Sequence, residues 1–117
     1  MKVILIDDSN SFRELMHEFL TISGYEIDSY STIPQETLKA QLFLVDWNIK
    51  DKTSSDLIIK IRKDNPKSHI YVLTGNILMS NLKSQIESLG VTGIINKPID
   101  PDDLLNILEG IKINLSK

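Results

Sequence analysis

Cysteine is absent from this chain of 117 residues, and its absence removes several chemistries at once. Without a thiol there is no disulfide, no thiolate metal site and no cysteine nucleophile. Long apolar runs are also missing. No stretch approaches the roughly 18 apolar residues of a membrane span, and the run at residues 3–6 is too short for a signal peptide. These absences predict a cytoplasmic protein with no membrane partner.

An excess of basic residues is missing too. The 13 lysines and arginines are outnumbered by 16 acidic residues, which gives a formal net charge of −3. Proteins that bind nucleic acid directly usually present a basic face, so we expect no direct contact with nucleic acid. The length, together with a hydrophobic fraction of 41%, fits one compact domain over residues 1–117.

What the sequence does contain is a regular alternation of short apolar runs and amphipathic segments. Strands are predicted at residues 2–6, 25–30, 42–45, 70–73 and 93–96. Helices are predicted at residues 10–22, 34–40, 55–64 and 80–90, and a last helix begins with Pro101 after the N-cap Asp100. The helix at 34–40 is the weakest, hardly two turns long. The alternation predicts an α/β fold, a doubly wound parallel sheet with helices on both faces.

Polar residues stand at the carboxyl ends of four predicted strands. Asp7 and Asp8 follow the first strand, Asp46 ends the third, Thr74 the fourth and Lys97 the fifth. Ligands of parallel α/β sheets bind beyond these ends, so the three carboxylates converge if the first and third strands are neighbours. At an effective dielectric near 20, two unit charges about 4 Å apart repel by ~4 kcal/mol. Such a cluster must keep a proton or recruit a cation.

The donor types at these strand ends indicate which ligands would bind. Oxygen ligands without histidine or cysteine favour a hard ion, and a small open site favours Mg²⁺. Lys97 supplies a point charge and Thr74 a hydroxyl donor, which are the groups that a phosphoryl group needs. The strand ends therefore predict a phosphoryl site.

Each of these residues also has a purely structural explanation. Asp46 alone could be a turn residue, and Asp7 or Asp8 could cap the first helix, as Ser9 also could. A lone threonine fits a strand, and a lone lysine fits the surface. Trp47 is expected to serve packing or to cover a loop, and not to take part in chemistry. The occurrence of polar partners at four strand ends favours the chemical explanation.

The ordered set of these residues resembles the receiver domains of two-component response regulators, over nearly the whole chain. The set consists of Asp7-Asp8, Arg13, Asp46-Trp47-Asn48, Thr74 and Lys97-Pro98. Its central segment is similar to the phosphorylation segment of chemotaxis-type single-domain regulators. The resemblance implies a single receiver domain over residues 1–117, a flavodoxin-like three-layer sandwich with strand order 2-1-3-4-5. The segment between Gly24 and Asp46 is shorter than is usual in the family, which implies a shortened second helix.

The resemblance implies a role for each acidic residue. Asp46 would be the phosphoacceptor, and the donor would be the phosphohistidine of a histidine kinase or of a phosphotransfer protein. Asp8 would bind Mg²⁺ directly and Asp7 largely through water. Asp46 and the backbone carbonyl of Asn48 would complete the protein ligands.

The same resemblance implies the roles of the remaining residues. Lys97 would neutralise one phosphoryl oxygen, Thr74 would donate its hydroxyl to another, and the Lys97–Pro98 bond would be cis. Phosphorylation would switch a surface formed by the fourth helix, the fifth strand and the fifth helix toward an unidentified output protein. The protein would catalyse only its own phosphorylation and dephosphorylation and would not be an enzyme in the usual sense.

Three positions depart from the family pattern. Lys50 stands where the family usually has proline, and Ser54 where the loop usually has glycine. A left-handed backbone at Ser54 would cost about 1–2 kcal/mol, so we expect a loop of a different shape. Ile94 stands where an aromatic ring usually turns inward on activation, so any switch must use backbone shifts or other packing.

Three other functions are weighed against the phosphoacceptor. A degenerate receiver would bind partners without phosphorylation, and the altered loop and Ile94 favour it. A magnesium phosphatase would want a second carboxylate near Asp46, but position 48 is asparagine. A flavin-binding domain would need a hydroxyl-rich phosphate loop after the first strand, and the segment at residues 7–11 is too acidic for that. The complete acidic set with Thr74 and Lys97 favours the phosphoacceptor.

Overall fold

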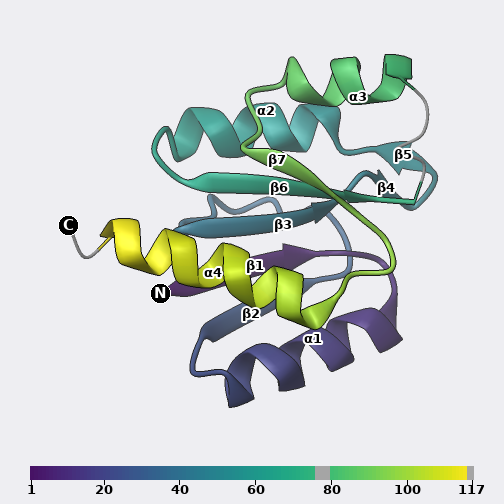
Figure 1. The fold of residues 1–117 in the computed structure, drawn as a ribbon. Helices are drawn as coiled ribbons and strands as arrows, with labels where there is room; N and C mark the ends of the chain where they lie inside the picture. Colours follow the sequence, from purple (N-terminus) through teal and green to yellow (C-terminus); the bar gives the residue numbers. More distant parts are fainter. Residues whose placement is uncertain (76–79, 116–117) are drawn as a thin grey trace.

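The computed structural model describes residues 1–75 and 80–115. Its centre is a five-stranded parallel sheet, beside which lies a small antiparallel hairpin (Figure 1). The sheet contains β1 (Lys2–Ile6), β2 (Glu26–Tyr30), β3 (Leu42–Asp46), β6 (His69–Thr74) and β7 (Gly93–Asn96). The hairpin consists of β4 (Asn48–Ile49) and β5 (Lys52–Thr53). The described helices are α1 (Asn10–Ile22), α2 (Ser55–Asp64), α3 (Ser80–Glu87) and α4 (Pro101–Leu115).

The strand order is β2-β1-β3-β6-β7, which confirms the order implied by the resemblance. From β1 the chain goes first to β2 on one side and then to β3 on the other. Because the connections from β1 and from β3 leave in opposite directions, a crevice opens at the carboxyl ends of these two strands. The register aligns Ile6 with Val45, so the residues that follow each of them lie side by side.

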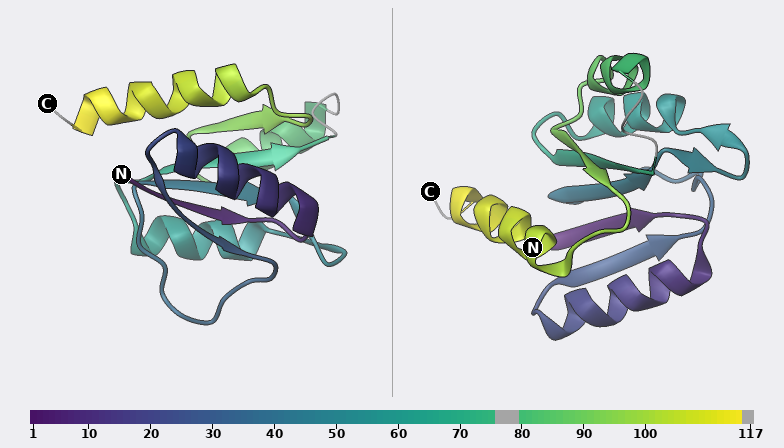
Figure 2. Two further views of the ribbon diagram at one scale, coloured as in Figure 1. Left: turned by 90° about the horizontal axis from the view of Figure 1, so that it is seen from below. Right: turned by 45° about the vertical axis from the view of Figure 1, so that its right-hand side comes forward.

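Each face of the sheet packs against its own pair of helices (Figures 1 and 2). On one face, Ile58 of α2 and Ile86 of α3 share a buried cluster with Phe43. On the other face, Leu20 of α1 and Leu108 of α4 belong to a second cluster. The central strands are buried on both sides, and this is why they occur as continuous apolar runs in the sequence. The three-layer sandwich is thereby confirmed. Among the described residues, no helix has the length and apolar character needed to cross a membrane.

The prediction of a helix at residues 34–40 was wrong. The chain between β2 and β3 forms a wide loop (Figure 2, left). A helix of two turns is marginal unless an apolar face supports it, and in this segment only Leu38 and Ala40 are buried. Tertiary hydrogen bonds hold the loop instead. Asn65 Nδ2 donates to the Leu38 carbonyl at 2.9 Å, and Ser68 Oγ donates to the Ala40 carbonyl.

No helix lies between β2 and β3, and β2 carries polar residues on the face of the sheet that such a helix would cover. The register aligns Asp28 with Ile4, a residue of the cluster under α2 and α3, so both side chains lie on that face. Asp28 remains about half exposed, and its carboxylate pairs with Lys2 Nζ at 2.9 Å. A charge is stable there because only a loop, and no helix, follows β2. Charges on an edge strand also discourage pairing with other chains.

We expect Asn65→Ala to lower the free energy of unfolding by about 1–3 kcal/mol, because the Leu38 carbonyl loses its donor. Asn65 is only 7% exposed and also donates to the Ile61 carbonyl at 3.1 Å. Urea denaturation measures the change. Asn106→Ala, at an exposed position in α4, is the control with the same chemical change. Equal stabilities of Asn65→Ala and the wild type would contradict this role of the loop contact.

Candidate functional site

Three aspartates meet at the carboxyl ends of β1 and β3. Asp7 and Asp8 follow β1 directly, and Asp46 is the last residue of β3. Each offers one carboxylate oxygen, and these oxygens lie within 4.8 Å of one another. Asp7 is fully buried, the Asp46 side chain is 13% exposed, and Asp8 is exposed to solvent. The structure therefore brings together the three carboxylates that the strand ends predicted.

Asp7 is held in place from several sides. The Ser9 N–H donates to Asp7 Oδ1 at 2.9 Å, and the Arg13 guanidinium donates to the Asp7 carbonyl at 2.7 Å. Ser9 is the residue that caps α1, because its hydroxyl accepts the Phe12 N–H at 3.3 Å. A capping role therefore does not explain the two aspartates.

Lys97 contacts both buried carboxylates of the cluster. Its Nζ lies 2.7 Å from Asp7 Oδ2 and 3.7 Å from Asp46 Oδ1. The same ammonium lies 4.8 Å from the centre of the Phe12 ring, within the range of a cation–π contact. The Lys97 N–H donates to the Thr74 carbonyl at 2.9 Å, and the Lys97–Pro98 bond is cis, as the resemblance implies.

Thr74 lies at the same edge of the sheet, on the strand next to β3. The register aligns Leu73 with Asp46, so Thr74 lies on β6 one residue beyond the level of Asp46. Its side chain is buried, with 2% exposure. The predicted lysine and hydroxyl groups thus come from the two strand ends that follow β3 across the sheet.

The carboxyl of Asp46 has an unusual environment. Burial and the neighbouring Asp7, with a smaller contribution from Asp8, raise the pKa of Asp46 from 3.8 to about 6. Lys97 and a backbone hydrogen bond from Asn48 oppose this rise. The opposing effects do not cancel, because burial and the two neighbouring carboxylates together outweigh one ammonium and one hydrogen bond. A divalent cation would favour the ionised form of Asp46.

The hairpin that follows Asp46 presents Asn48 to the site. Ile49 pairs with Lys52 next to the turn, and Asn48 pairs with Thr53. In an antiparallel pair, directly opposed residues alternate between exchanging both hydrogen bonds and exchanging none. Ile49 and Lys52 flank the two-residue turn and are the pair that exchanges both bonds. Asn48 and Thr53 therefore exchange none, and the N–H and carbonyl of Asn48 point away from β5. Its N–H reaches the Asp46 carboxylate, which places its carbonyl on the same side.

The expected change of loop shape is found at different residues from those anticipated. Ser54 has φ −90°, outside the left-handed region, and its Oγ donates to the Asp46 carbonyl. The left-handed residues are Lys50, with φ 52°, and Asp51, with φ 65°. They form the tip of the β4–β5 hairpin, an element that was not predicted from the sequence.

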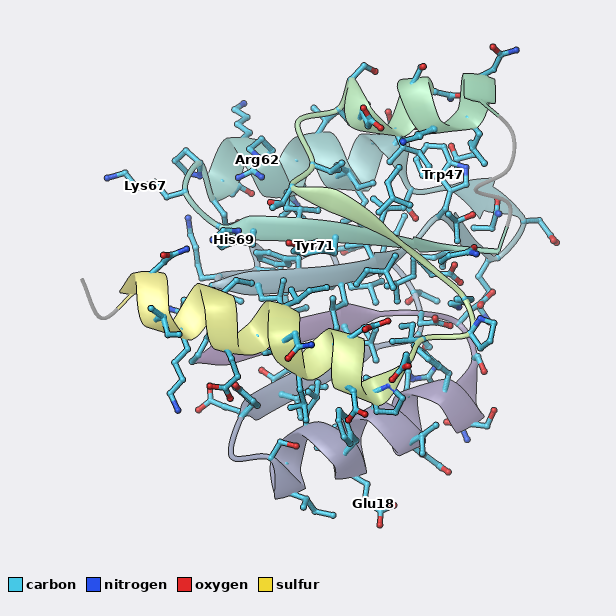
Figure 3. All side chains as sticks on the ribbon, in the orientation of Figure 1. Glu18, Trp47, Arg62, Lys67, His69 and Tyr71 are labelled. Carbon is cyan, nitrogen blue, oxygen red and sulfur yellow. The ribbon has the colours of Figure 1, made fainter. Side chains whose placement is uncertain are left out.

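Trp47 serves packing, as predicted. Its side chain is 3% exposed and belongs to the cluster under α2 and α3 (Figure 3). Its N–H donates to the Leu73 carbonyl at 2.9 Å, which extends the pairing of β3 with β6. Ile94, in β7, is partly buried against the same cluster. The indole is therefore held by core packing immediately after Asp46.

The donor set fits Mg²⁺. All candidate ligands are carboxylate or carbonyl oxygens, and three carboxylates with one ammonium leave an excess of negative charge. Both oxygens of Asp7 already accept hydrogen bonds, from Ser9 and Lys97. Asp7 is therefore better suited to bind through water, whereas Asp8, Asp46 and the Asn48 carbonyl are better suited to bind directly.

Two contacts of the site were missed from the sequence. Phe12 belongs to α1, and nothing in the sequence places the Lys97 ammonium over its ring. The Lys50 N–H donates to Asp8 Oδ2 at 3.1 Å across 42 positions of the chain. Residues that tolerate the left-handed conformation, such as Asp51, are the only local signal of the turn that makes this contact.

The sheet order and the polar residues at its switch point define the flavodoxin-like class of α/β proteins. The model of the response regulator receiver domain family matches residues 3–109. The chain belongs to this family of two-component signalling domains. Membership implies contact with a kinase or phosphotransfer protein and with an output partner.

The curated relatives include proteins of similar length and longer ones. Chemotaxis protein CheY1 of Helicobacter pylori is 26% identical over 120 residues, which cover 93% of this chain and 94% of that protein. The photosynthetic apparatus regulatory protein RegA of Rhodobacter capsulatus is 22% identical, over 91% of this chain and 60% of that protein. Among solved structures, a two-component response regulator from Clostridium difficile has a TM-score of 0.89 at 19% identity, with coverage of 100% and 99%. This last likeness shows the fold.

Proposed function

We propose that this chain is a phosphoacceptor receiver, which takes a phosphoryl group on Asp46 from a phosphohistidine in the presence of Mg²⁺. The observation that carries the proposal is that the Asp46 carboxylate lies together with those of Asp7 and Asp8 and beside the Lys97 ammonium. The protein would act only on its own phosphorylation state and would not be an enzyme acting on other molecules. The absence of cysteine suits a reducing cytoplasm.

In the transfer, an Asp46 carboxylate oxygen attacks the phosphorus atom of the donor. A new P–O bond forms, the P–N bond breaks, and its electron pair stays on the imidazole nitrogen of the donor. A pKa near 6 leaves Asp46 mostly ionised at neutral pH, as a nucleophile must be. Lys97 would neutralise one phosphoryl oxygen, and Thr74 would donate its hydroxyl to another. Bound Mg²⁺ would supply charge compensation between the carboxylates and the phosphoryl group.

The output surface that we propose consists of α3, β7 and α4. Ile94 lies in the middle of β7 and packs against the core, so phosphorylation would act on this surface through packing and backbone shifts. A ligand shifts such an equilibrium only by its different affinity for the two states. The partner would therefore bind the phosphorylated form more tightly than the unmodified form.

The decisive experiment is the intact mass of the protein after incubation with Mg²⁺ and a small acyl phosphate. We expect one added phosphoryl group on the wild type and none on Asp46→Asn or after chelation of the metal. Asp102→Asn, at an exposed position of α4, is the matched control and should be modified like the wild type. An adduct that persists in Asp46→Asn would overturn the assignment of the acceptor.

The rival function is the degenerate receiver, which binds partners without phosphorylation. It would give no adduct, although Trp47 fluorescence could still respond to metal. A beryllofluoride titration separates this case from rapid hydrolysis of the acyl phosphate, because beryllofluoride occupies the acceptor site without turnover. A saturable Trp47 response that requires Mg²⁺ would support the phosphoacceptor, and no response would support the degenerate receiver.

A further inference from the structure

The tip of the β4–β5 hairpin has a geometry that leaves the backbone N–H of Lys50 outside the hairpin's own hydrogen bonds. Ile49 and Lys52 pair on either side of a two-residue turn formed by Lys50 and Asp51. Both turn residues have positive φ, 52° and 65°, as in a type I′ turn. Side chains with a Cβ rarely adopt this conformation. The flanking pair makes the hairpin bonds, so the N–H of Lys50 is directed elsewhere.

That N–H is directed at the metal-binding edge of the site. It donates to Asp8 Oδ2 at 3.1 Å and joins the hairpin to the end of β1. Asp8 is exposed, and the other bonds of the site hold Asp7 and Asp46. The hairpin thus contacts two of the candidate ligands, Asp8 through the N–H of Lys50 and Asp46 through the N–H of Asn48.

We propose that Lys50 is a positioning residue, whose backbone N–H aims the Asp8 carboxylate at the magnesium site. This inference rests on the proposed function. With Oδ2 bonded to Lys50, Oδ1 is left to face the cation, and less rotamer freedom is lost when the cation binds. The coupling is reciprocal by linkage, so metal at Asp8 also stabilises the hairpin. This contact would account for the left-handed turn, because that turn directs the Lys50 N–H toward Asp8.

The first test compares Lys50→Gly with Lys50→Pro in Mg²⁺ titrations followed by Trp47 fluorescence. Glycine keeps the N–H and adopts positive φ readily, so its Kd should stay within about twofold of the wild type. Proline removes the N–H and cannot adopt positive φ, and we expect a Kd about tenfold higher, the lower limit for loss of a group that orients a metal ligand. Equal affinities for both variants would overturn the proposal. Equal weakening in both would assign the effect to the lysine side chain and also overturn it.

A second measurement needs neither metal nor a proline variant. Amide hydrogen exchange by NMR, in the presence of a chelator, compares the wild type with Asp8→Ala. The Lys50 amide should lose about tenfold of its protection in Asp8→Ala, whereas the Lys52 amide, inside the hairpin, should keep its protection. Unchanged exchange at Lys50 would overturn the proposal. If the wild type shows this contact but binds no Mg²⁺, the proposed function fails in its metal dependence while the contact stands.

Discussion

Asp46→Asn is expected to stabilise the metal-free protein at neutral pH by about 1–2 kcal/mol. One unit of pKa corresponds to about 1.4 kcal/mol, and the rise from 3.8 to about 6 means that the folded state disfavours the charged carboxylate. The substitution removes this charge from beside Asp7 and Asp8. The shift already includes the opposing attraction of Lys97. The expected gain is smaller than the shift alone indicates, because the asparagine amide has one acceptor oxygen where the carboxyl group has two.

The sign of the pH dependence follows from the same shift. Between about pH 4 and pH 6 the folded state binds more protons at Asp46 than the unfolded state does, so the wild type loses stability as the pH rises through this window. The difference between Asp46→Asn and the wild type should be near zero at the acidic end and complete at about pH 7. Urea unfolding over this range, with a chelator present, measures it.

The control for this prediction is Mg²⁺ itself. Because a ligand stabilises the folded state by RT ln(1 + [L]/Kd), saturating Mg²⁺ should stabilise the wild type more than Asp46→Asn and narrow the difference between them. An Asp46→Asn protein that is less stable than the metal-free wild type at neutral pH would contradict the electrostatic account of the cluster.

Arg62→Met is expected to lower the free energy of unfolding by about 2–4 kcal/mol, since several charge-assisted hydrogen bonds are lost together. Arg62 lies toward the end of α2 (Figure 3), and its Nη1 donates to the carbonyls of Asn65, Pro66 and Ser68. Its Nε donates to the Gly90 carbonyl at 3.0 Å, where the chain leaves α3. One guanidinium thus joins the end of α2, the turn into β6 and the segment after α3.

Methionine retains the packing of the Arg62 stem, so the experiment isolates the guanidinium. Lys63→Met, at the next position and exposed, is the matched control and should change stability by less than about 0.5 kcal/mol. Arg62→Lys should recover only part of the loss, because an ammonium lacks the planar fork. Guanidinium chloride unfolding measures all three variants. Equal stabilities of Arg62→Met and Lys63→Met would contradict the role of the guanidinium. The role of Arg62 could not be predicted from the sequence, because the basic residues near it have the composition of an ordinary solvated helix end.

The strands and the acidic cluster could be predicted because they depend on local patterns and one general rule. Continuous apolar runs identify strands buried on both faces, and the carboxyl ends of neighbouring parallel strands collect the polar residues. This placed Asp7, Asp46 and Thr74 at one edge without knowledge of any contact. The strand order came from the resemblance, since spacing alone does not distinguish the possible neighbours of β1.

The errors occurred where tertiary contacts override local preference. Residues 34–40 have a helical composition, but the hydrogen bond from Asn65 to the Leu38 carbonyl holds a loop. The β4–β5 hairpin escaped prediction because its strands have two residues each and its turn lacks the glycine that usually marks such turns. The contact of Lys50 with Asp8 depends on that turn and could not be anticipated without it.

The loop between β2 and β3 also determines where the chain can be lengthened. Residues 31–37 contain no helix or strand and no buried side chain, and the first buried anchor after them is Leu38. Doubling the length of a flexible loop costs only about 0.6 kcal/mol of closure entropy. An inserted peptide tag or small domain at Thr32–Ile33 would leave the sheet register and both helix layers in place. The segment that replaces a helix is thus the natural insertion point of this fold.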